Sequence, residues 1–487
     1  MGNRLGFRLP VGPALGNVRA MTALIRLLLF VAACFVGVVP LRALPPTVAL
    51  KTPAKLETGA RLEWTASSPE LEFTVEARSA LGTGEWTPLP GQTWPIPAKE
   101  FLDAAAAEAR FYRVVGTPIV GERGRLISTT LVTNLSQFQI QLIFGFGGIP
   151  ITPQSGVKVY KVIYETVDAQ GLRTQASGSL CLPDNRPAGG LPLVSYQHGT
   201  VTEREDVPSR LNFEGFIGVA MATSGYAAVL PDYLGLGDSP GIHPYHHAKS
   251  EATCVVDLLR ATRRYCASNT VTLSGKLFLT GYSQGGHATL AAMREIEEFH
   301  AAEFPITACA PGAGAYDLAG VTAEDFLADK AKPNPYYLPY LLVGLQDVYG
   351  WVDRWSDVLV APYATTIPPL FDGQHGSGEI NDKLPAKPSQ ILRPETLESF
   401  RNNPADPLRT LLRENDLIRW TPKAPLRLYH CSGDQDVPPA NMATALAAFH
   451  ARGATHVRAL DPQPGADHGG CAQPALLAAK AWFDTLK

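Results

Sequence analysis

The pentapeptide Gly281–Gly285 restricts the fold of this chain more than any other stretch, because it places a serine between two glycines in the pattern Gly-x-Ser-x-Gly. The apolar run Leu277–Thr280 precedes it, and His287–Phe299, a segment with helical periodicity, follows it. Glycines in this pattern are typical of a sharp strand-to-helix turn, where a Cβ atom would clash with a neighbouring strand or helix. The pattern therefore predicts a buried strand, a strained turn that exposes Ser283, and a helix.

Short apolar runs and helical segments alternate over residues 118–487. Leu193–Tyr196 and Ala227–Leu230 are apolar runs followed by Gly-rich or polar residues, as buried parallel strands often are. Glu251–Tyr265 has the composition and periodicity of a helix. Further strand-like and helical segments close the chain: Leu426–Tyr429, Asn441–Ala451, His456–Leu460 and Pro474–Leu486. We therefore expect an α/β fold with a mostly parallel sheet and helices on both faces.

The alternation breaks down between residues 318 and 425. This stretch has scattered helical pieces, many prolines, and a cluster of aromatic and apolar residues: Tyr336, Tyr337, Leu338, Tyr340, Leu341 and Leu342. A long insertion that lacks the sheet pattern is usually a functional cap or lid. We therefore expect a helical cap over residues 318–425.

Residues 1–43 have the pattern of a signal peptide. Arginines precede an apolar run of fourteen residues, 27–40, which is short for a membrane span but normal for the core of a signal peptide. Ala43 suits the end of a cleavage site, and a start at Met21 would give a more compact signal. An uncleaved membrane anchor and lipid attachment at Cys34 are the open alternatives. We therefore expect a protein secreted to the periplasm or the extracellular space, or anchored through its N-terminus.

Residues 44–117 are expected to form a separate all-β domain. Four apolar residues alternate with polar ones as in a half-buried strand: Leu71, Phe73, Val75 and Ala77. Leu62 and Trp64 mark a shorter strand, and 109–115 reads as the last one. These features resemble a fibronectin type III-like sandwich. A spacer is the favoured role for such a domain, with polymer binding as the alternative.

Ser283 is the candidate nucleophile, and a serine hydroxyl needs a base that is itself oriented by an acid. In folds with this turn, the acid and then the histidine follow the serine along the chain. His450 lies in a predicted helix and His456 in the last predicted strand. His468 lies in the glycine-rich loop 462–471 after that strand, from where an imidazole can reach back to Ser283. His468 is therefore the predicted base.

The acid is expected in the loop after the strand Leu426–Tyr429, where Asp434 and Asp436 compete. The spacing from the end of the strand to Val437-Pro438 favours Asp434. Asp317, after the preceding strand, is a third candidate. The aspartates that do not serve as the acid are expected to cap loops or face solvent.

The main-chain N–H groups of Gln284 and Thr200 are the predicted oxyanion hole. Gln284 follows the nucleophile directly. The second donor is expected from the loop after Leu193–Tyr196, where the pair His198-Gly199 leaves the next amide pointing at the site. Thr200 is therefore favoured over Gly199, and His198 is interpreted as a structural loop histidine.

The sequence does not indicate cofactor, metal or nucleic-acid binding. The Gly-rich loop 231–239 lacks the Lys-Ser/Thr of a phosphate-binding loop and the spacing of a dinucleotide fingerprint. His243, His246 and His247 have no carboxylate or cysteine beside them at ligand-like spacing, so no metal site is predicted. The net charge of −3, without a basic run beyond the N-terminus, argues against a nucleic-acid partner.

Cys431 and Cys471 flank Asp434 and His468 respectively. Both cysteines are expected near the C-terminal ends of the last two strands, which are neighbours in this fold. We therefore hypothesise a disulfide that joins the acid loop to the histidine loop. Two buried free cysteines are the open alternative.

Four segments resemble the secretory lipase family, which includes fungal lipase A-type enzymes and bacterial relatives. In order along the chain, they are Val194–Thr200, Pro231–Gly237, Gly281–Gly286 and the C-terminal segment with His468. The resemblance covers about residues 157–487. It implies an α/β-hydrolase fold, ester hydrolysis through an acyl-enzyme without a cofactor, and an insertion that covers the acyl site. The N-terminal β domain departs from the family pattern.

We therefore expect a secreted serine hydrolase of carboxylic esters, a lipase or esterase, that acts on a small-molecule or lipid ester. The apolar cluster in the insertion favours an apolar acyl group. Two alternatives remain: a serine peptidase or amidase on the same triad, and an exported binding protein whose hydrolase fold is inactive. Contact with a lipid surface or an extracellular polymer, and the oligomeric state, are left open.

Overall fold

The computed structural model describes residues 48–55, 60–66, 71–78, 86–90, 92, 96, 98–104, 110–118 and 123–487. The predicted signal peptide, residues 1–43, lies outside the described residues. Within the described ranges, no helix has both the length and the apolar character needed to cross a membrane.

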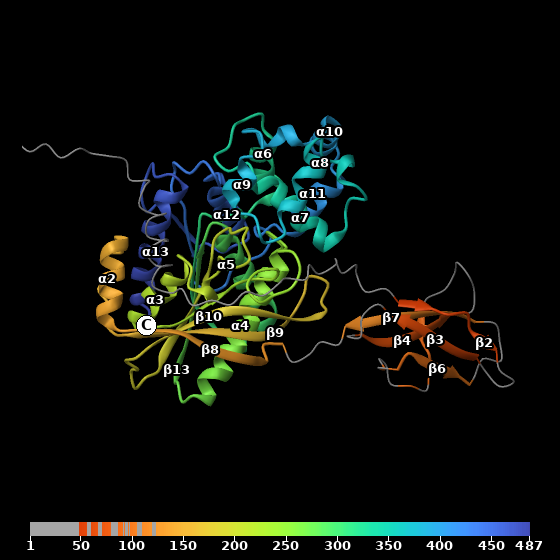
Figure 1. Cartoon of the computed structure of the whole chain (residues 1–487), viewed down its shortest axis with the longest axis horizontal. Coiled ribbons are helices and arrows are strands. Elements are labelled where there is room, and N and C mark those ends of the chain that lie inside the picture. The colour runs from red at the N-terminus through yellow and green to blue at the C-terminus, as the bar shows by residue number, and fades with distance from the viewer. Residues whose placement is uncertain are drawn as a thin grey trace, which may run out of the picture. The chain divides into compact units, whose positions relative to one another are not determined.

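The described residues between 48 and 118 form short antiparallel strands in two sheets (Figure 1). In the four-stranded sheet, the central strand β3 (Ala60–Ala66) pairs with β1 (Val48–Leu50), β2 (Ala54–Lys55) and β6 (Glu100–Asp103). In the three-stranded sheet, β4 (Leu71–Arg78) pairs with β5 (Thr87–Pro88) and β7 (Phe111–Pro118). Leu71, Phe73, Val75 and Ala77 are all buried, which confirms the alternation expected for β4. The fibronectin type III-like assignment stays a prediction.

The large sheet has nine strands in the order β16-β15-β14-β13-β11-β12-β10-β9-β8. The parallel part confirms the predicted strands and consists of β11 (Leu191–Gln197), β12 (Ala227–Pro231), β13 (Leu273–Tyr282), β14 (Ile306–Gly312), β15 (Arg427–Tyr429) and β16 (Arg458–Leu460). The antiparallel part, which the sequence analysis did not identify, consists of β8 (Leu126–Leu135), β9 (Val157–Val167) and β10 (Arg173–Pro183). The expected mostly parallel sheet is therefore confirmed.

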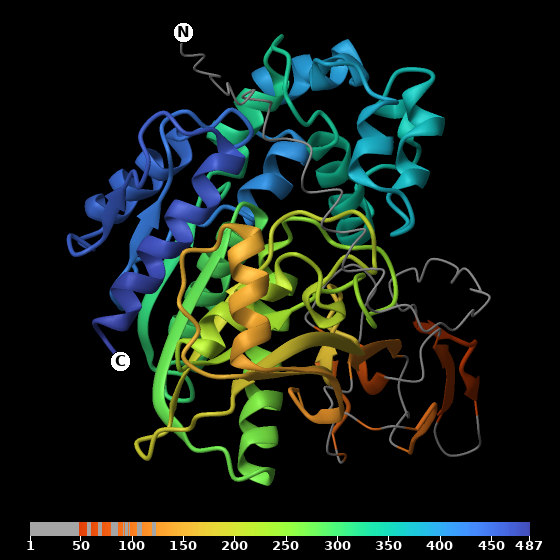
Figure 2. The ribbon, with the colours of Figure 1, turned by 60° about the vertical axis from the view of Figure 1, so that its left-hand side comes forward.

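Helices cover both faces of this sheet (Figures 1 and 2). The helices of one face are α4 (Ala248–Ser268), α5 (Gln284–Glu295) and α12 (Ala440–Ala451), and those of the other are α2 (Gln137–Gly147), α3 (Gly215–Thr223) and α13 (His468–Asp484). Two hydrophobic cores result, because successive strand residues point to opposite faces. Leu279 packs in the core of the first face, and its neighbour Phe278 packs in the core of the second.

Most of residues 318–425, the region of the predicted cap, consists of short helices that pack around a separate hydrophobic core (Figure 1). The role of this region as a cap stays a prediction. The cap helices are α6 (Ala323–Leu327), α7 (Tyr337–Tyr349), α8 (Tyr363–Thr366), α9 (Ser377–Asn381), α10 (Pro394–Asn402) and α11 (Pro407–Glu414). Short turns of helix join the elements of the chain: η1 (Pro208–Arg210), η2 (Ile296–His300), η3 (Leu318–Thr322), η4 (Trp355–Asp357), η5 (Pro368–Leu370) and η6 (Pro388–Ile391). Most of the predicted apolar cluster packs inside this core, since Leu338, Tyr340 and Leu342 are buried.

Candidate active site

Ser283 occupies the turn between β13 and α5, as the sequence predicts. Its φ of 62° lies in the left-handed region, which a residue with a side chain seldom adopts. The flanking glycines make the turn possible, because a Cβ atom at Gly285 would overlap the carbonyl oxygen of Gln197. The Ser283 N–H donates to the Gly312 carbonyl oxygen at 3.0 Å, which holds the turn against the neighbouring strand β14.

Ser283, His468 and Asp434 form a continuous hydrogen-bonded run. The Ser283 hydroxyl lies 2.9 Å from Nε2 of His468, and Nδ1 of His468 lies 2.6 Å from Oδ2 of Asp434. Because a carboxylate only accepts, Nδ1 carries the proton and donates to Asp434, which leaves Nε2 free to accept from the serine. This order of donors is the one that nucleophilic catalysis by a serine requires.

The structure separates the three candidate acids. Asp434 contacts His468, and its Oδ1 also accepts from the main-chain N–H groups of Asp436 and Val437. Asp436 instead accepts from the Asn334 side chain at 2.8 Å. Asp317 caps the turn η3 through the N–H groups of residues 320 and 321. Only Asp434, of these three, hydrogen-bonds to His468.

Two histidines keep Asp434 ionised. Burial by itself would raise the pKa of this carboxyl, but hydrogen bonds from His430 and His468, reinforced by the charge of these rings when protonated, outweigh burial. The pKa of Asp434 is therefore held well below its usual range. An acid that stays ionised can orient the His468 ring and stabilise the imidazolium that forms during proton transfer.

His468 lies in the first turn of α13, which corrects the expectation that it belongs to a loop. The helix begins six residues before the predicted start at Pro474, because the Asp467 side chain caps it by accepting from the Gly470 N–H at 2.7 Å. The Tyr282 hydroxyl donates to the His468 carbonyl oxygen at 2.7 Å. The predicted base, His468, is therefore positioned by a capped helix and by Tyr282, the residue before Ser283.

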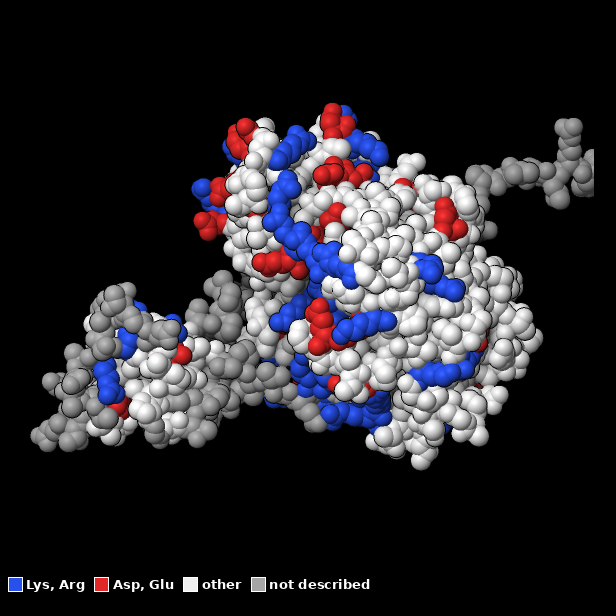
Figure 3. Space-filling model, turned by 180° about the vertical axis from the view of Figure 1, so that it is seen from behind, with Lys and Arg blue, Asp and Glu red and all other residues white. Residues whose placement is uncertain are grey.

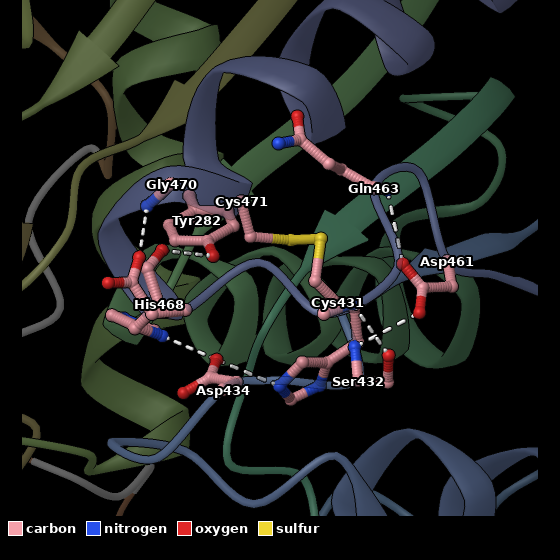
Figure 4. The surroundings of a disulfide bond; sticks show 12 residues. Tyr282, Cys431, Ser432, Asp434, Asp461, Gln463, His468, Gly470 and Cys471 are labelled. Carbon is pink, nitrogen blue, oxygen red and sulfur yellow. Dashed lines mark hydrogen bonds and ion pairs between the residues drawn. A yellow bond between two sulfur atoms is a disulfide. The ribbon is translucent and has the colours of Figure 1, made fainter.

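A disulfide joins Cys431 to Cys471, with their Cα atoms 5.8 Å apart, which confirms the hypothesised bond (Figure 4). Cys431 lies in the loop after β15, shortly before Asp434, and Cys471 lies in the first turn of α13, shortly after His468. The bond therefore links the segment that carries Asp434, the predicted acid, to the helix that carries His468, the predicted base. The other described cysteines are buried and form no disulfide: Cys181, Cys254, Cys266 and Cys309.

The predicted oxyanion donors both lie beside Ser283. Gln284 begins α5, and the first N–H groups of a helix lack intrahelical partners. The Gly199 N–H is engaged, because it donates to both carboxylate oxygens of Glu214 at 3.1 and 3.0 Å. No hydrogen bond from the Thr200 N–H occurs among the described residues. These contacts favour Thr200 over Gly199, and the role of Thr200 and Gln284 stays a prediction.

Glu214 is a residue of the site that the sequence analysis missed. It directly precedes α3, and its carboxylate accepts from the Tyr196 hydroxyl at 2.5 Å as well as from the Gly199 N–H. Glu214 therefore fixes the loop that carries Thr200. No local pattern in the sequence indicates this contact, because the carboxylate and the loop belong to separate elements.

A buried polar network holds the side chain of Gln284. Its Nε2 donates to Oε1 of Glu251 at 2.9 Å and to Nε2 of His243 at 2.7 Å. Burial lowers the pKa of His243 to about 3, so its ring stays neutral and can accept this hydrogen bond. The side chain of Gln284, whose main-chain N–H is a predicted oxyanion donor, is therefore held from two sides.

Three side chains that could bind a metal ion meet at this network, which the sequence pattern did not indicate; the absence of a metal site stays a prediction. Potential ligand atoms of His246, Glu251 and His287 lie within 4.8 Å of one another, a spacing that could hold a metal ion. The sequence analysis missed the group because Glu251 lies five residues after His246 and His287 comes from another helix. Both ring nitrogens of His287 have protein partners, Glu251 at 2.7 Å and the Asn415 carbonyl oxygen at 3.2 Å. This pairing accounts for His287 as part of a hydrogen-bonded network.

Two cavities open on Ser283. The larger, of about 430 Å³, lies between α3, α13 and the segment after α2, and His468 and Thr200 also line it. The smaller, of about 20 Å³, lies against the cap, where Tyr337 and Leu341 line it together with Gln284. A reacting group at Ser283 would therefore have access to a space on either side.

The chain is similar to known lipases and esterases. The model of the secretory lipase family matches residues 209–326. The rice cell wall degrading esterase LipA from Xanthomonas oryzae, in a ligand-bound form, is 30% identical with a TM-score of 0.68, and the match covers 75% of this chain and 100% of that chain. No curated protein sequence matches the chain.

Two further solved structures are similar. A putative hydrolase from Legionella pneumophila subsp. pneumophila is 30% identical with a TM-score of 0.69, over 74% of this chain and 98% of that chain. Lipase A from Candida antarctica, in its closed state, is 19% identical with a TM-score of 0.56, over 75% of this chain and 83% of that chain. The second likeness concerns the fold alone.

Proposed function

Because the chain belongs to the α/β-hydrolase lipase family, we propose that it hydrolyses carboxylic esters through an acyl-enzyme on Ser283. The observation that carries this proposal is the run from Ser283 through His468 to Asp434, with distances of 2.9 and 2.6 Å. A serine, an imidazole with a free nitrogen and an ionised acid in this order are what acyl transfer requires.

The reaction proceeds in two proton-coupled steps. His468 takes the Ser283 proton as the hydroxyl attacks the ester carbonyl, and Asp434 stabilises the imidazolium. The N–H groups of Gln284 and Thr200 bind the oxyanion of the tetrahedral intermediate. His468 then protonates the departing alcohol, and water repeats the sequence to release the acid.

A comparison of wild type with Ser283→Ala on p-nitrophenyl esters tests the proposal. We expect kcat/KM to fall at least about a thousandfold in the variant, because the nucleophile is lost. Ser274→Ala, an exposed serine at the far end of β13, is the matched control and should retain activity within about twofold. Equal activity of Ser283→Ala and wild type would contradict the proposed nucleophile.

The peptidase or amidase alternative is separated by matched substrates. An ester and an amide of the same acid and the same aryl leaving group differ only in the scissile bond. The proposal expects the ester to be cleaved at least about a hundredfold faster, because an amide is intrinsically less reactive and needs a leaving nitrogen to be protonated. An inert wild type would favour the exported binding protein.

We also propose that the protein is exported and meets its substrate at a lipid surface. The signal pattern in residues 1–43 and the secretory lipase match support export. The helix α2 supports a lipid surface, because it has no charged residue, and Phe138 and Phe146 are 70% and 85% exposed. N-terminal sequencing of the mature protein tests export, and a chain that retains residue 1 outside the membrane fraction would contradict a cleaved signal.

A further inference from the structure

The cavities on the two sides of Ser283 differ about twentyfold in volume, at about 430 and 20 Å³. Ser283 lines both, so an ester bound with its carbonyl carbon at the serine extends one arm toward each cavity. One arm is the acyl chain and the other is the alcohol. The size of each cavity therefore limits one arm of the substrate.

The position of His468 determines which arm enters which cavity. In the proposed mechanism the departing alcohol takes its proton from Nε2 of His468, so the alcohol lies on the side of that ring. His468 and Gly469 line the larger cavity, and neither is among the residues that line the smaller one. The smaller cavity is lined by Gln284, by residues of the cap region such as Leu341, and by the segments around His246 and Val437. The alcohol arm therefore faces the larger cavity, and the acyl arm faces the smaller one.

The smaller cavity is narrow. One water molecule needs a cavity of about 10–15 Å³, so about 20 Å³ leaves room for a short acyl group and not for an extended chain. Its walls include Leu318, Phe326 and Leu341, which are buried in the core of the cap. A longer acyl chain would have to displace side chains that are already closely packed.

The larger cavity suits a bulky apolar group. Its walls are mainly apolar side chains of α3 and α13, among them Phe216, Met221 and Leu476. The charged residues on its wall have protein partners: Glu214 accepts from the Gly199 N–H, and Lys480 pairs with Asp484 at 2.7 Å. Its volume lies within the range of about 300–1,000 Å³ that holds small organic ligands.

We infer that the substrates are esters of a short acid, such as acetic acid, with a bulky apolar alcohol; this inference rests on the proposed serine mechanism. In the first step, Oγ of Ser283 bonds to the acyl carbon, the ester C–O bond breaks, and His468 passes the serine proton to the departing alcohol. In the second step, the oxygen of a water molecule bonds to the acyl carbon, the bond to Oγ breaks, and one water proton returns to Ser283. The short acid then leaves.

Two ester series measured on the wild-type protein test this inference. In the first, 2-naphthylmethyl acetate, butanoate and octanoate vary the acid; kcat/KM should fall about tenfold or more from acetate to butanoate. In the second, methyl, benzyl and 2-naphthylmethyl acetate vary the alcohol; kcat/KM should rise about tenfold or more along the series. A preference for octanoate, or no preference among alcohols, would overturn the inference while ester hydrolysis stands. No hydrolysis of any ester would overturn the proposed function as well.

Variants in each cavity test the assignment of the arms. Ala472→Phe fills the larger cavity and should lower kcat/KM for 2-naphthylmethyl acetate about tenfold more than for methyl acetate. Ala481→Phe, an exposed alanine of the same helix outside the cavity, is the matched control.

Leu341→Ala enlarges the smaller cavity and should raise the ratio of butanoate to acetate hydrolysis about tenfold. Phe326→Leu tests the same cavity if Leu341→Ala does not fold. If Ala472→Phe changed selectivity among acids and Leu341→Ala changed it among alcohols, the inference would be wrong.

Discussion

The Glu214 carboxylate accepts from two donors, the Gly199 N–H and the Tyr196 hydroxyl, and so fixes the loop that carries the predicted oxyanion residue Thr200. A glutamine oxygen could replace Oε2, which accepts from both donors, but the amide nitrogen would then face the Gly199 N–H in place of Oε1. A donor would meet a donor there, and the negative charge would be lost. The loop would then present the Thr200 N–H less accurately. Glu214 acts in this account as a positioning residue.

We therefore expect Glu214→Gln to lower kcat about 10- to 100-fold with little change in KM, because oxyanion contacts strengthen only in the transition state. Steady-state kinetics on a p-nitrophenyl ester measure the two constants separately. Glu205→Gln, an exposed glutamate of the same loop region, is the matched control. A rise in KM with unchanged kcat would show that Glu214 contributes to substrate binding instead.

At the scale of elements, the disulfide Cys431–Cys471 joins the loop after β15 to the start of α13 across 40 residues of chain. Its removal in Cys431→Ser/Cys471→Ser frees the segment that carries Asp434 from the helix that carries His468. We expect a loss of about 3–4 kcal/mol in the free energy of unfolding from loop entropy. Chemical unfolding with and without a reductant measures this loss. A reductant should lower the free energy of unfolding of wild type and leave that of the double variant unchanged. If the reductant cleaved the disulfide and the stability of wild type did not change, the expected role of the bond would be wrong.

The helix α2 exposes phenylalanine next to the larger cavity. Ile149 and Ile151, directly after this helix, line that cavity, and Gln473 of α13 donates to the Gly148 carbonyl oxygen at 3.1 Å. Figure 2 shows α2 and α13 side by side. Seen from behind, in Figure 3, lysine, arginine, aspartate and glutamate side chains are spread among uncharged residues. An apolar surface at the mouth of an active-site cavity suits contact with lipid.

Phe138→Ser/Phe146→Ser should therefore reduce binding to phosphatidylcholine vesicles at least about fivefold, because two exposed apolar rings are lost from the contact. Hydrolysis of a soluble ester should stay within about twofold of wild type. Vesicle co-sedimentation and a soluble-ester assay measure the two effects. Phe299→Ser removes an equally exposed phenylalanine elsewhere and serves as control. Equal vesicle binding by the double variant and wild type would count against α2.

At the scale of the whole molecule, buried neutral histidines make stability depend on pH. Burial lowers the pKa of His243 to about 3 and that of His247 to about 4, and it holds that of His246 well below its usual value. Below about pH 6.5 the unfolded chain binds protons at these residues while the folded protein does not. The contribution of these neutral rings to the free energy of unfolding is therefore complete above pH 6.5. It is lost as the pH falls toward 4 for His247 and toward 3 for His243. Asp416, whose pKa burial raises to about 6, acts in the opposite direction and loses its contribution as the pH rises through 6.

The three histidines together should outweigh Asp416, with a loss of about 1 kcal/mol per histidine for each pH unit below 6.5. Urea unfolding at pH 7.5, 6 and 5 measures the trend as a falling midpoint. His247→Gln should make the decline shallower, because one proton fewer is taken up on unfolding. A midpoint that does not change between pH 7.5 and 5 would contradict this account.

Local sequence patterns predicted the strands, turns and helices that carry the candidate site residues. They did not predict contacts between elements that lie far apart in the chain. The turn at Ser283 is readable because strand, glycines and helix are contiguous in the chain. The start of α13 was misplaced because the glycines after His468 suggested a loop, although Asp467 is a helix-capping residue. Glu214 and Glu251 were missed since their partners lie on other elements. The antiparallel strands β8–β10 were not identified, although β9 is rich in the β-branched and aromatic residues that favour strands.

Covalent labelling shows whether Ser283 is the activated nucleophile. A p-nitrophenyl phosphonate reacts with a serine only when a base and an oxyanion hole activate it. After incubation with this reagent, mass spectrometry of the peptide that contains Ser283 should show one phosphonyl group on that serine, in proportion to the lost esterase activity. An adduct on another residue, or full inhibition with Ser283 unmodified, would contradict the account.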